Sequence, residues 1–177
     1  GAICVGARDG RYSDKGVRPM PAHNFPLAAL GVFILWFGWF GFNGGSTLSA
    51  DPASIATVIL VTNLSGSAGF LASLLHVRLR TGYMDLSMGL NGGLAGLVAI
   101  TAGADVIGPA ESILVGSIGG IIVVEGVLLL DRLRIDDPVG AVPVHLFGGV
   151  FGTLAVGLFA NTESTKGLFH GGGVSLL

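Results

Sequence analysis

The chain has 177 residues, of which 51% are apolar and 11% are charged, and its mean hydropathy is +0.78. Because so few charged residues cannot cover the surface of a water-soluble globule, the composition favours an integral membrane protein. A net charge of −2 with scattered basic residues excludes the basic surface that nucleic acid requires. The single cysteine, Cys4, excludes an intrachain disulfide framework and a cysteine-based zinc site.

The first residues do not have the pattern of a secretory signal. Residues 1–6 form a short apolar stub that runs into polar sequence and resembles the end of a longer helix. We therefore interpret the start as a point within a longer protein rather than a signal peptide.

Five apolar segments follow in chain order, and each is predicted to be a transmembrane helix of a single, all-α membrane domain over residues 1–177. Each has about 20 residues, enough to cross roughly 30 Å of hydrocarbon at 1.5 Å per residue. The segment 101–109 is either a tight turn or a break in one helix. The predicted spans are 24–46, 52–75, 86–104, 106–130 and 138–160.

Two helix starts carry a capping pattern, in which an aspartate precedes a proline at the first helical position. Asp51 precedes Pro52, and Asp137 precedes Pro138. A carboxylate accepts free backbone N–H groups there, and proline needs no N–H partner in the first turn. These two boundaries are therefore expected to lie at residues 52 and 138.

Basic residues indicate the orientation of the chain. Eight of the nine lie before the first span, between the second and third, or between the fourth and fifth. The positive-inside rule makes these loops cytoplasmic, so we expect a multi-pass protein of the cell membrane with its amino-terminal end inside and its carboxyl-terminal end outside. These residues are Arg8, Arg11, Lys15, Arg18, Arg78, Arg80, Arg132 and Arg134.

Glycines spaced four apart indicate close helix packing, since small residues let helices approach where lipid removes the hydrophobic drive. Every predicted span except the second carries such a pair, although some pairs arise by chance in a glycine-rich chain. The pairs are Gly41/Gly45, Gly89/Gly93, Gly92/Gly96, Gly116/Gly120 and Gly148/Gly152.

His145 is the most informative ionisable residue. It lies seven residues into the fifth span, roughly 10 Å along the helix, and therefore near the middle of the bilayer. An ionisable group at that depth is costly and is by default a functional residue. The alternative is a neutral imidazole that bonds to a neighbouring helix.

The first span carries a stripe formed by Leu35, Trp39, Phe42 and Ser46. Aromatic faces attract small cations, so the stripe is a candidate cation path. The alternatives are ordinary packing or an interfacial aromatic belt. Ser46 could bond to a ligand, although a serine at a helix end most often bonds to backbone.

The remaining ionisable residues have structural interpretations. Glu125 is explained by snorkelling or an interhelical hydrogen bond, Glu111 by a helix amino terminus, and His76 by the cytoplasmic edge. We find no catalytic triad, carboxylate pair, metal-ligand set or cofactor motif, so the sequence does not indicate an enzyme.

Five blocks of sequence resemble successive signatures of the ammonium transporter family (Amt/Mep/Rh). The resemblance implies an eleven-helix fold built from two inverted five-helix repeats, of which this chain is the carboxyl-terminal repeat. The blocks are residues 23–27 (HNFPL), 35–46 (LWFGWFGFNGGS), 90–101 (LNGGLAGLVAIT), 136–145 (DDPVGAVPVH) and 167–173 (GLFHGGG).

The resemblance also implies roles for six residues. Phe42 is similar to a gating phenylalanine of the outer vestibule, Ser46 to a contact of the external ammonium site, and His145 to one of two paired pore histidines. The others are similar to two pore-lining residues and one structural carboxylate, namely Trp39, Leu35 and Asp137. The chain departs from some members at Gly140, where they have aspartate, and at His170, where tyrosine is common.

By this resemblance the expected function is transmembrane transport of ammonium or ammonia, with methylammonium as an analogue. The lipid bilayer, a homotrimer and a cytosolic PII-type regulator are the implied partners, and no cofactor is implied. Half a pore is expected to be inactive alone. The alternatives are an ammonium sensor with the same fold and a non-conducting structural membrane protein.

Overall fold

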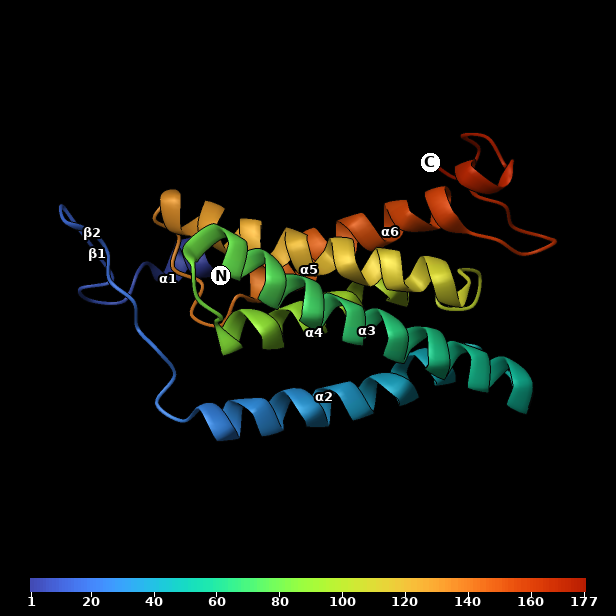
Figure 1. Cartoon of the computed structure of the whole chain (residues 1–177), viewed down its shortest axis with the longest axis horizontal. Helices are drawn as coiled ribbons and strands as arrows, with labels where there is room; N and C mark the ends of the chain where they lie inside the picture. Colours follow the sequence, from blue (N-terminus) through green and yellow to red (C-terminus); the bar gives the residue numbers. More distant parts are fainter.

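The computed structural model describes residues 1–177, and its long helices lie side by side in one bundle (Figure 1). Four helical segments are long and apolar enough to cross a membrane, and α4 is shorter, with 16 residues. The chain is therefore an all-helical membrane protein. The helices are α2 (Phe25–Gly45), α3 (Pro52–Thr81), α4 (Leu86–Thr101), α5 (Pro109–Arg132), and the π-helical turn η1 (Val142–Phe147), which continues into α6 (Gly148–Phe159).

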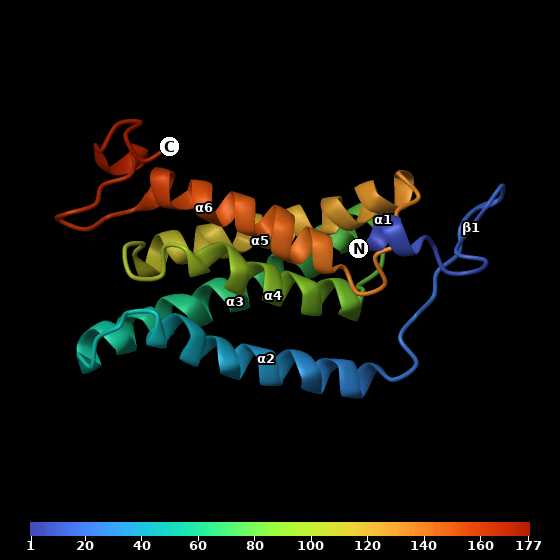
Figure 2. The ribbon, with the colours of Figure 1, turned by 180° about the vertical axis from the view of Figure 1, so that it is seen from behind.

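Short elements lie at the two ends of the bundle (Figures 1 and 2). At one end are helix α1 (Ala2–Val5) and a hairpin of β1 (Tyr12–Ser13) and β2 (Gly16–Val17). At the other end is the 3-10 turn η2 (Leu168–His170), close to the carboxyl terminus.

Helix boundaries differ from the expected spans in two places, and at the first of them polar residues continue the helix beyond its apolar part. Helix α3 runs to Thr81 instead of residue 75, and ends at Gly82, which has a left-handed φ of 90°. Helix α4 ends at Thr101 and α5 begins at Pro109, so the segment between them is a turn rather than a broken helix.

The expected start of the fifth helix at Pro138 is wrong. Asp51 caps α3 as expected, because its side chain accepts from the Ser54 amide at 2.9 Å. Asp137 instead accepts from the amide of Val142 at 2.7 Å, and helical hydrogen bonding begins there. Pro138 therefore lies in a turn between the aspartate and the helix that it caps.

Helix α3 is the element on which α4 and α5 pack. Ser65 and Gly69 of α3 face glycines of both neighbours, and Ser65 Oγ donates to the Gly96 carbonyl at 2.8 Å. A methyl group added at Gly96 or Gly116 would overlap the Ser65 carbonyl. Such close approach gives van der Waals contact between backbones, which is the main packing force available in lipid.

The GxxxG pattern is therefore used on α4, α5 and α6 but not on α2. Gly152 of α6 lies against Ala99 of α4, where an added methyl group would come within 2.5 Å of the carbonyl oxygen. At Gly41 and Gly45 the same addition would meet nothing within 4 Å. The helix without a GxxxG pair, α3, is the one that receives the glycines of its neighbours.

All three loops that the sequence predicts to be cytoplasmic lie at the same end of the bundle (Figures 1 and 2). They join α1 to α2, α3 to α4, and α5 to η1. Eight of the nine basic residues of the chain therefore gather at one end. That this end faces the cytoplasm stays a prediction from the positive-inside rule.

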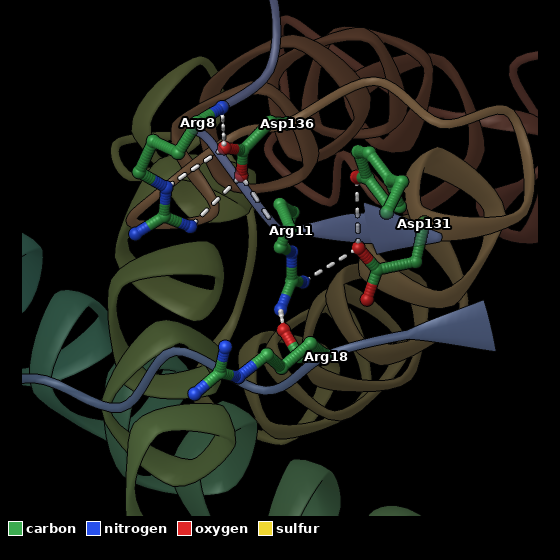
Figure 3. A network of polar contacts seen from close by, with 6 residues as sticks. Arg8, Arg11, Arg18, Asp131 and Asp136 are labelled. Atoms are coloured by element: carbon green, nitrogen blue, oxygen red, sulfur yellow. Dashed lines mark hydrogen bonds and ion pairs between the residues drawn. The ribbon is translucent and has the colours of Figure 1, made fainter. Parts of the chain in front are cut away.

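The segment after α1 is attached by ion pairs to the end of α5 and to the loop that follows it (Figure 3). Arg8 binds Asp136, with Nε and Nη2 donating at 2.7 and 2.8 Å and the backbone N at 2.9 Å. Arg11 donates to Asp131 at 2.6 Å. The side-chain hydrogen bonds from Arg8 lower the pKa of Asp136 from its ordinary value of 3.8 to about 2.

We expect the acid dependence of this attachment to follow the lowered pKa of Asp136. The carboxylate stays ionised at about pH 4, where an ordinary aspartate is half protonated, and the attachment is lost as the pH falls through about 2. A spin label at Lys15→Cys, in a Cys4→Ser background, should become mobile only near that lower pH. In Asp136→Asn it should be mobile at neutral pH, and immobility there would contradict the attachment.

We also expect Gly116→Ala, placed in the complete gene product, to destabilise the bundle by about 1–3 kcal/mol because the methyl group forces α3 and α5 apart. The matched control is Gly41→Ala, which meets open space. That change should be neutral or stabilise by up to about 1 kcal/mol, since alanine is the better helix former. Thermal unfolding in detergent measures both, and equal midpoints would contradict the packing argument.

Candidate functional site

The candidate site lies along α2, which begins at a capped turn. Asn24 accepts from the amide of Leu27 at 2.9 Å and so satisfies one free N–H group of the first turn. Leu35 and Phe42 are 52% and 60% exposed, so their side chains point away from the rest of this chain. The predicted stripe therefore lies on an open face of the bundle.

Trp39 joins this stripe to the other helices. Its indole Nε1 donates to Thr101 Oγ1 of α4 at 2.8 Å, and Thr101 donates in turn to the Leu97 carbonyl. The Trp39 ring lies 5.8 Å from the Phe42 ring and stacks on the His145 ring at 6.5 Å, with 14° between the planes. Trp39 thus lies beside both Phe42 and His145, which are far apart in the sequence.

His145 lies in the π-helical turn η1 rather than in a regular α-helix. The turn spans Val142–Phe147 and contains Pro143, which has no N–H group for the helical ladder. π-Helical turns insert one residue into a helix and thereby redirect the side chains on it. The imidazole of His145 is exposed on the open face beside Trp39.

Ser46 lies at the end of α2, and its hydroxyl donates to the Phe42 carbonyl at 2.7 Å. The backbone bond that the sequence allowed as an alternative is therefore present. Because the hydroxyl proton is used in this bond, the oxygen keeps its acceptor positions for another group. Ser46 is exposed.

Asn43 and Trp36 are residues that the sequence analysis did not single out as site residues. Asn43 is 4% exposed and donates to Thr62 Oγ1 at 3.0 Å, while its carbonyl oxygen is buried without a partner. Trp36 packs on the glycine positions Gly66 and Gly93 and donates to Asn63 at 3.2 Å. Trp36, Trp39 and Asn43 recur at helical spacing. This spacing is the one signal in the sequence that could have identified the face of α2 that packs on the other helices.

The aromatic side chains of α2 therefore divide between two faces. One group surrounds a shallow groove between α2 and α3, away from the stripe that contains Trp39 and Phe42. The groove is lined by Phe33, Trp36, Phe37, Phe40, Asn63 and Ser67.

The other ionisable residues pair away from the stripe. His76 and Glu125 lie 2.7 Å apart, and Arg80 Nε lies 2.9 Å from the same carboxylate, so an interhelical bond accounts for Glu125. His170 lies 3.3 Å from Glu111 at the opposite end. No group of three or more histidine, cysteine, aspartate or glutamate residues could hold a metal ion.

The side chains of this stripe are of the kinds that recognise a solute. Two aromatic rings, one imidazole and one hydroxyl lie in sequence along membrane helices on a face that this chain leaves open. Aromatic faces attract cations, and the imidazole can donate or accept a hydrogen bond. These groups suit a small, polar or cationic solute.

The chain is similar over its whole length to a family of known proteins. The model of the family described as Ammonium Transporter Family matches residues 1–177. Ammonium transporter Amt2 of Archaeoglobus fulgidus is 46% identical over 168 residues, covering 94% of this chain and 36% of that protein. Ammonium transporter 3 of Dictyostelium discoideum is 36% identical over 191 residues, covering 100% of this chain and 44% of that protein.

Solved structures agree with these relatives. A structure described as "Sensor Amt Protein" superposes with a TM-score of 0.90 at 37% identity, covering 99% of this chain and 44% of that one. Candida albicans Mep2 superposes with a TM-score of 0.87 at 30% identity, covering 99% of this chain and 41% of that one. The chain thus spans less than half the length of each of these four relatives.

We expect the Trp39–Thr101 hydrogen bond to fix the ring that supports His145. In a double-mutant cycle of Trp39→Phe and Thr101→Val, the two changes should couple by about 1 kcal/mol, the usual net value of such a bond. The measurement is the unfolding free energy of the complete gene product in detergent. Strictly additive losses would show that the bond contributes nothing.

Proposed function

The chain belongs to the ammonium transporter family, and we propose that it forms one side of a transmembrane path for ammonium or ammonia. The observation that carries this proposal is the stack of Phe42, Trp39 and His145 on an open face of membrane-spanning helices. It is a file of cation-attracting and hydrogen-bonding groups where lipid-facing helices would carry aliphatic side chains.

The path begins at the end of α2, where Ser46 and Phe42 recruit the cation. Ammonium donates a hydrogen bond to the Ser46 oxygen, whose own proton is engaged by the Phe42 carbonyl. The face of Phe42 adds cation–π attraction. Together these contacts replace part of the hydration shell that the ion must lose.

Beyond Phe42 the path becomes apolar, which distinguishes ammonium from potassium. A bare cation loses many kcal/mol of hydration there, whereas neutral ammonia crosses at much lower cost. Ammonium therefore gives up a proton, to water at the outer end of the path or to the His145 imidazole, and potassium, which has no proton to lose, is excluded. Leu35 and Trp39 line this part of the path.

His145 receives the neutral species or relays its proton beyond the constriction. Its imidazole presents one donor and one acceptor when neutral, and stacking on Trp39 restricts the ring to one orientation. Asp137 acts structurally, because its carboxylate caps the turn that carries His145.

The open face of the stripe is the surface that the rest of a full-length protein would cover. The chain corresponds to 36% to 44% of its four named relatives, so we propose that a second, inverted repeat completes the pore and that this chain alone does not transport. The same proposal includes a homotrimer and a PII-type regulator as partners. It also places the Arg8 end in the cytoplasm and involves no enzymatic step or cofactor.

A sensor is the second candidate, favoured by the similarity to the structure described as "Sensor Amt Protein". In a sensor the same stripe would bind ammonium, while the output would be a change in a partner protein. The two candidates differ in whether solute crosses the membrane. A structural role without conduction is the third alternative, in which neither Phe42 nor His145 is needed.

We expect methylammonium uptake by the complete gene product in a transporter-deficient cell to fall about tenfold or more in His145→Ala and in Phe42→Ala. The control is Leu71→Ala, an exposed α3 side chain outside the stripe, at matched membrane expression. Loss in both variants but not in the control supports the path. Ammonium binding without uptake in the wild type would favour the sensor, and unaffected variants would favour a structural role.

A further inference from the structure

We propose that Arg8 and Arg11, in the segment before α2, are positioning residues that hold the start of the helix carrying His145. They act through the loop between α5 and η1, and the functional part of this inference rests on the proposed path. The partners in each ion pair are more than 100 residues apart in the sequence, so the pairs attach the first segment of the chain to the end of α5 and the loop that follows it.

The first step is the burial of Asp136. Its side chain is 1% exposed and receives three N–H groups of Arg8, two from the guanidinium and one from the backbone (Figure 3). Bidentate pairing of this kind fixes geometry as well as charge. Removal of Arg8 would leave a buried carboxylate with Arg11 Nε, at 3.7 Å, as its nearest cation.

Arg11 supports the same loop from its other side. Arg11 Nη2 donates to Asp131 at 2.6 Å, and Tyr12 donates to the same carboxylate oxygen at 3.2 Å. Arg11 Nη1 donates to the Arg18 carbonyl at 2.8 Å. Asp131 is in the last turn of α5. The two arginines therefore hold both ends of the stretch 131–136.

The second step leads from Asp136 to the helix start. Asp137 is the next residue, and its carboxylate accepts from the Val142 amide at 2.7 Å. Between them Gly140 has a φ of +76°, and Asn91 of α4 donates to the Val139 carbonyl at 3.0 Å. The turn is thus fixed by Arg8 on one side and by α4 on the other.

The third step is the short distance along the chain from this cap to His145. Val142 is the first residue of the π-helical turn, and His145 lies three residues later in it. Pro143 follows Val142 and has no N–H group, so the Val142 amide that Asp137 holds fixes the start of this turn. Movement of Asp137 would be passed to the imidazole that stacks on Trp39.

Misplacement of a positioned group by about 1 Å can cost a large factor in rate without removing the group itself. Solute recruitment near Ser46 and Phe42 lies at the other end of α2 from this anchor. Loss of the anchor should therefore lower the maximal uptake rate while leaving the concentration for half-maximal uptake nearly unchanged.

The test compares Arg8→Ala, Arg8→Lys and the control Lys15→Ala in the complete gene product. Lys15 is an exposed basic residue of the same segment before α2, so its removal changes the charge equally. Hydrogen–deuterium exchange of the amides in residues 139–147 reports the helix start directly. Methylammonium uptake in proteoliposomes reports the path.

In Arg8→Ala we expect exchange in residues 139–147 to accelerate about tenfold and maximal uptake to fall about tenfold, with half-saturation within about twofold of wild type. Arg8→Lys keeps the charge without the bidentate fork, so its exchange rate and maximal uptake should lie between those of wild type and Arg8→Ala. Lys15→Ala should match wild type. This graded result would support positioning by geometry.

Unchanged exchange in residues 139–147 of Arg8→Ala would overturn the proposal, as would equal acceleration along all helices. If Arg8→Ala does not insert, Arg8→Lys decides by the same exchange measurement. Absence of uptake in the wild type would reject the proposed path, but the exchange result would still determine whether Arg8 positions the turn.

Discussion

Close contact between α3 and its two neighbours is the constraint on which the rest of the structure depends. Ser65 and Gly69 lie directly against the glycines of α4 and α5, where a single added methyl group would overlap backbone. In lipid the association of helices depends on this contact, since no water is released by burying apolar side chains. The glycine contacts thereby determine where α4 and α5 lie. Helix α4 in turn supports α6, and α3 and α4 together support α2.

Helix α2 and the η1–α6 helix attach to this glycine-packed centre differently, and the difference creates the candidate site. Helix α6 places Gly152 against α4, whereas α2 is held by the large side chains of Trp36 and Trp39. An indole contact keeps backbones further apart than a glycine contact does. The remaining face of α2, with Phe42, can therefore meet His145 across Trp39 in the open part of the bundle.

The charged groups at the end of the bundle are paired in a different way from the polar groups inside it. Ion pairs there involve buried or half-buried carboxylates, as between Arg8 and Asp136, because a loop at the membrane surface can bring arginine to a carboxylate. Inside the bundle the polar contacts are instead uncharged hydrogen bonds, such as Asn43 to Thr62. This division agrees with the high cost of unpaired charge in hydrocarbon.

The sequence by itself determined the helical class, the apolar segments, the cap at Asp51 and the stripe on α2, because these depend on local composition and periodicity. Its motifs also indicated the family. Only the tertiary structure decided that Asp137 caps Val142, that His145 lies in a π-helical turn, and that Arg8 binds Asp136. These depend on contacts between residues far apart in the chain or on a backbone register that no local pattern specifies. The physical reason is that helix formation is local, whereas the choice of partners depends on which surfaces meet.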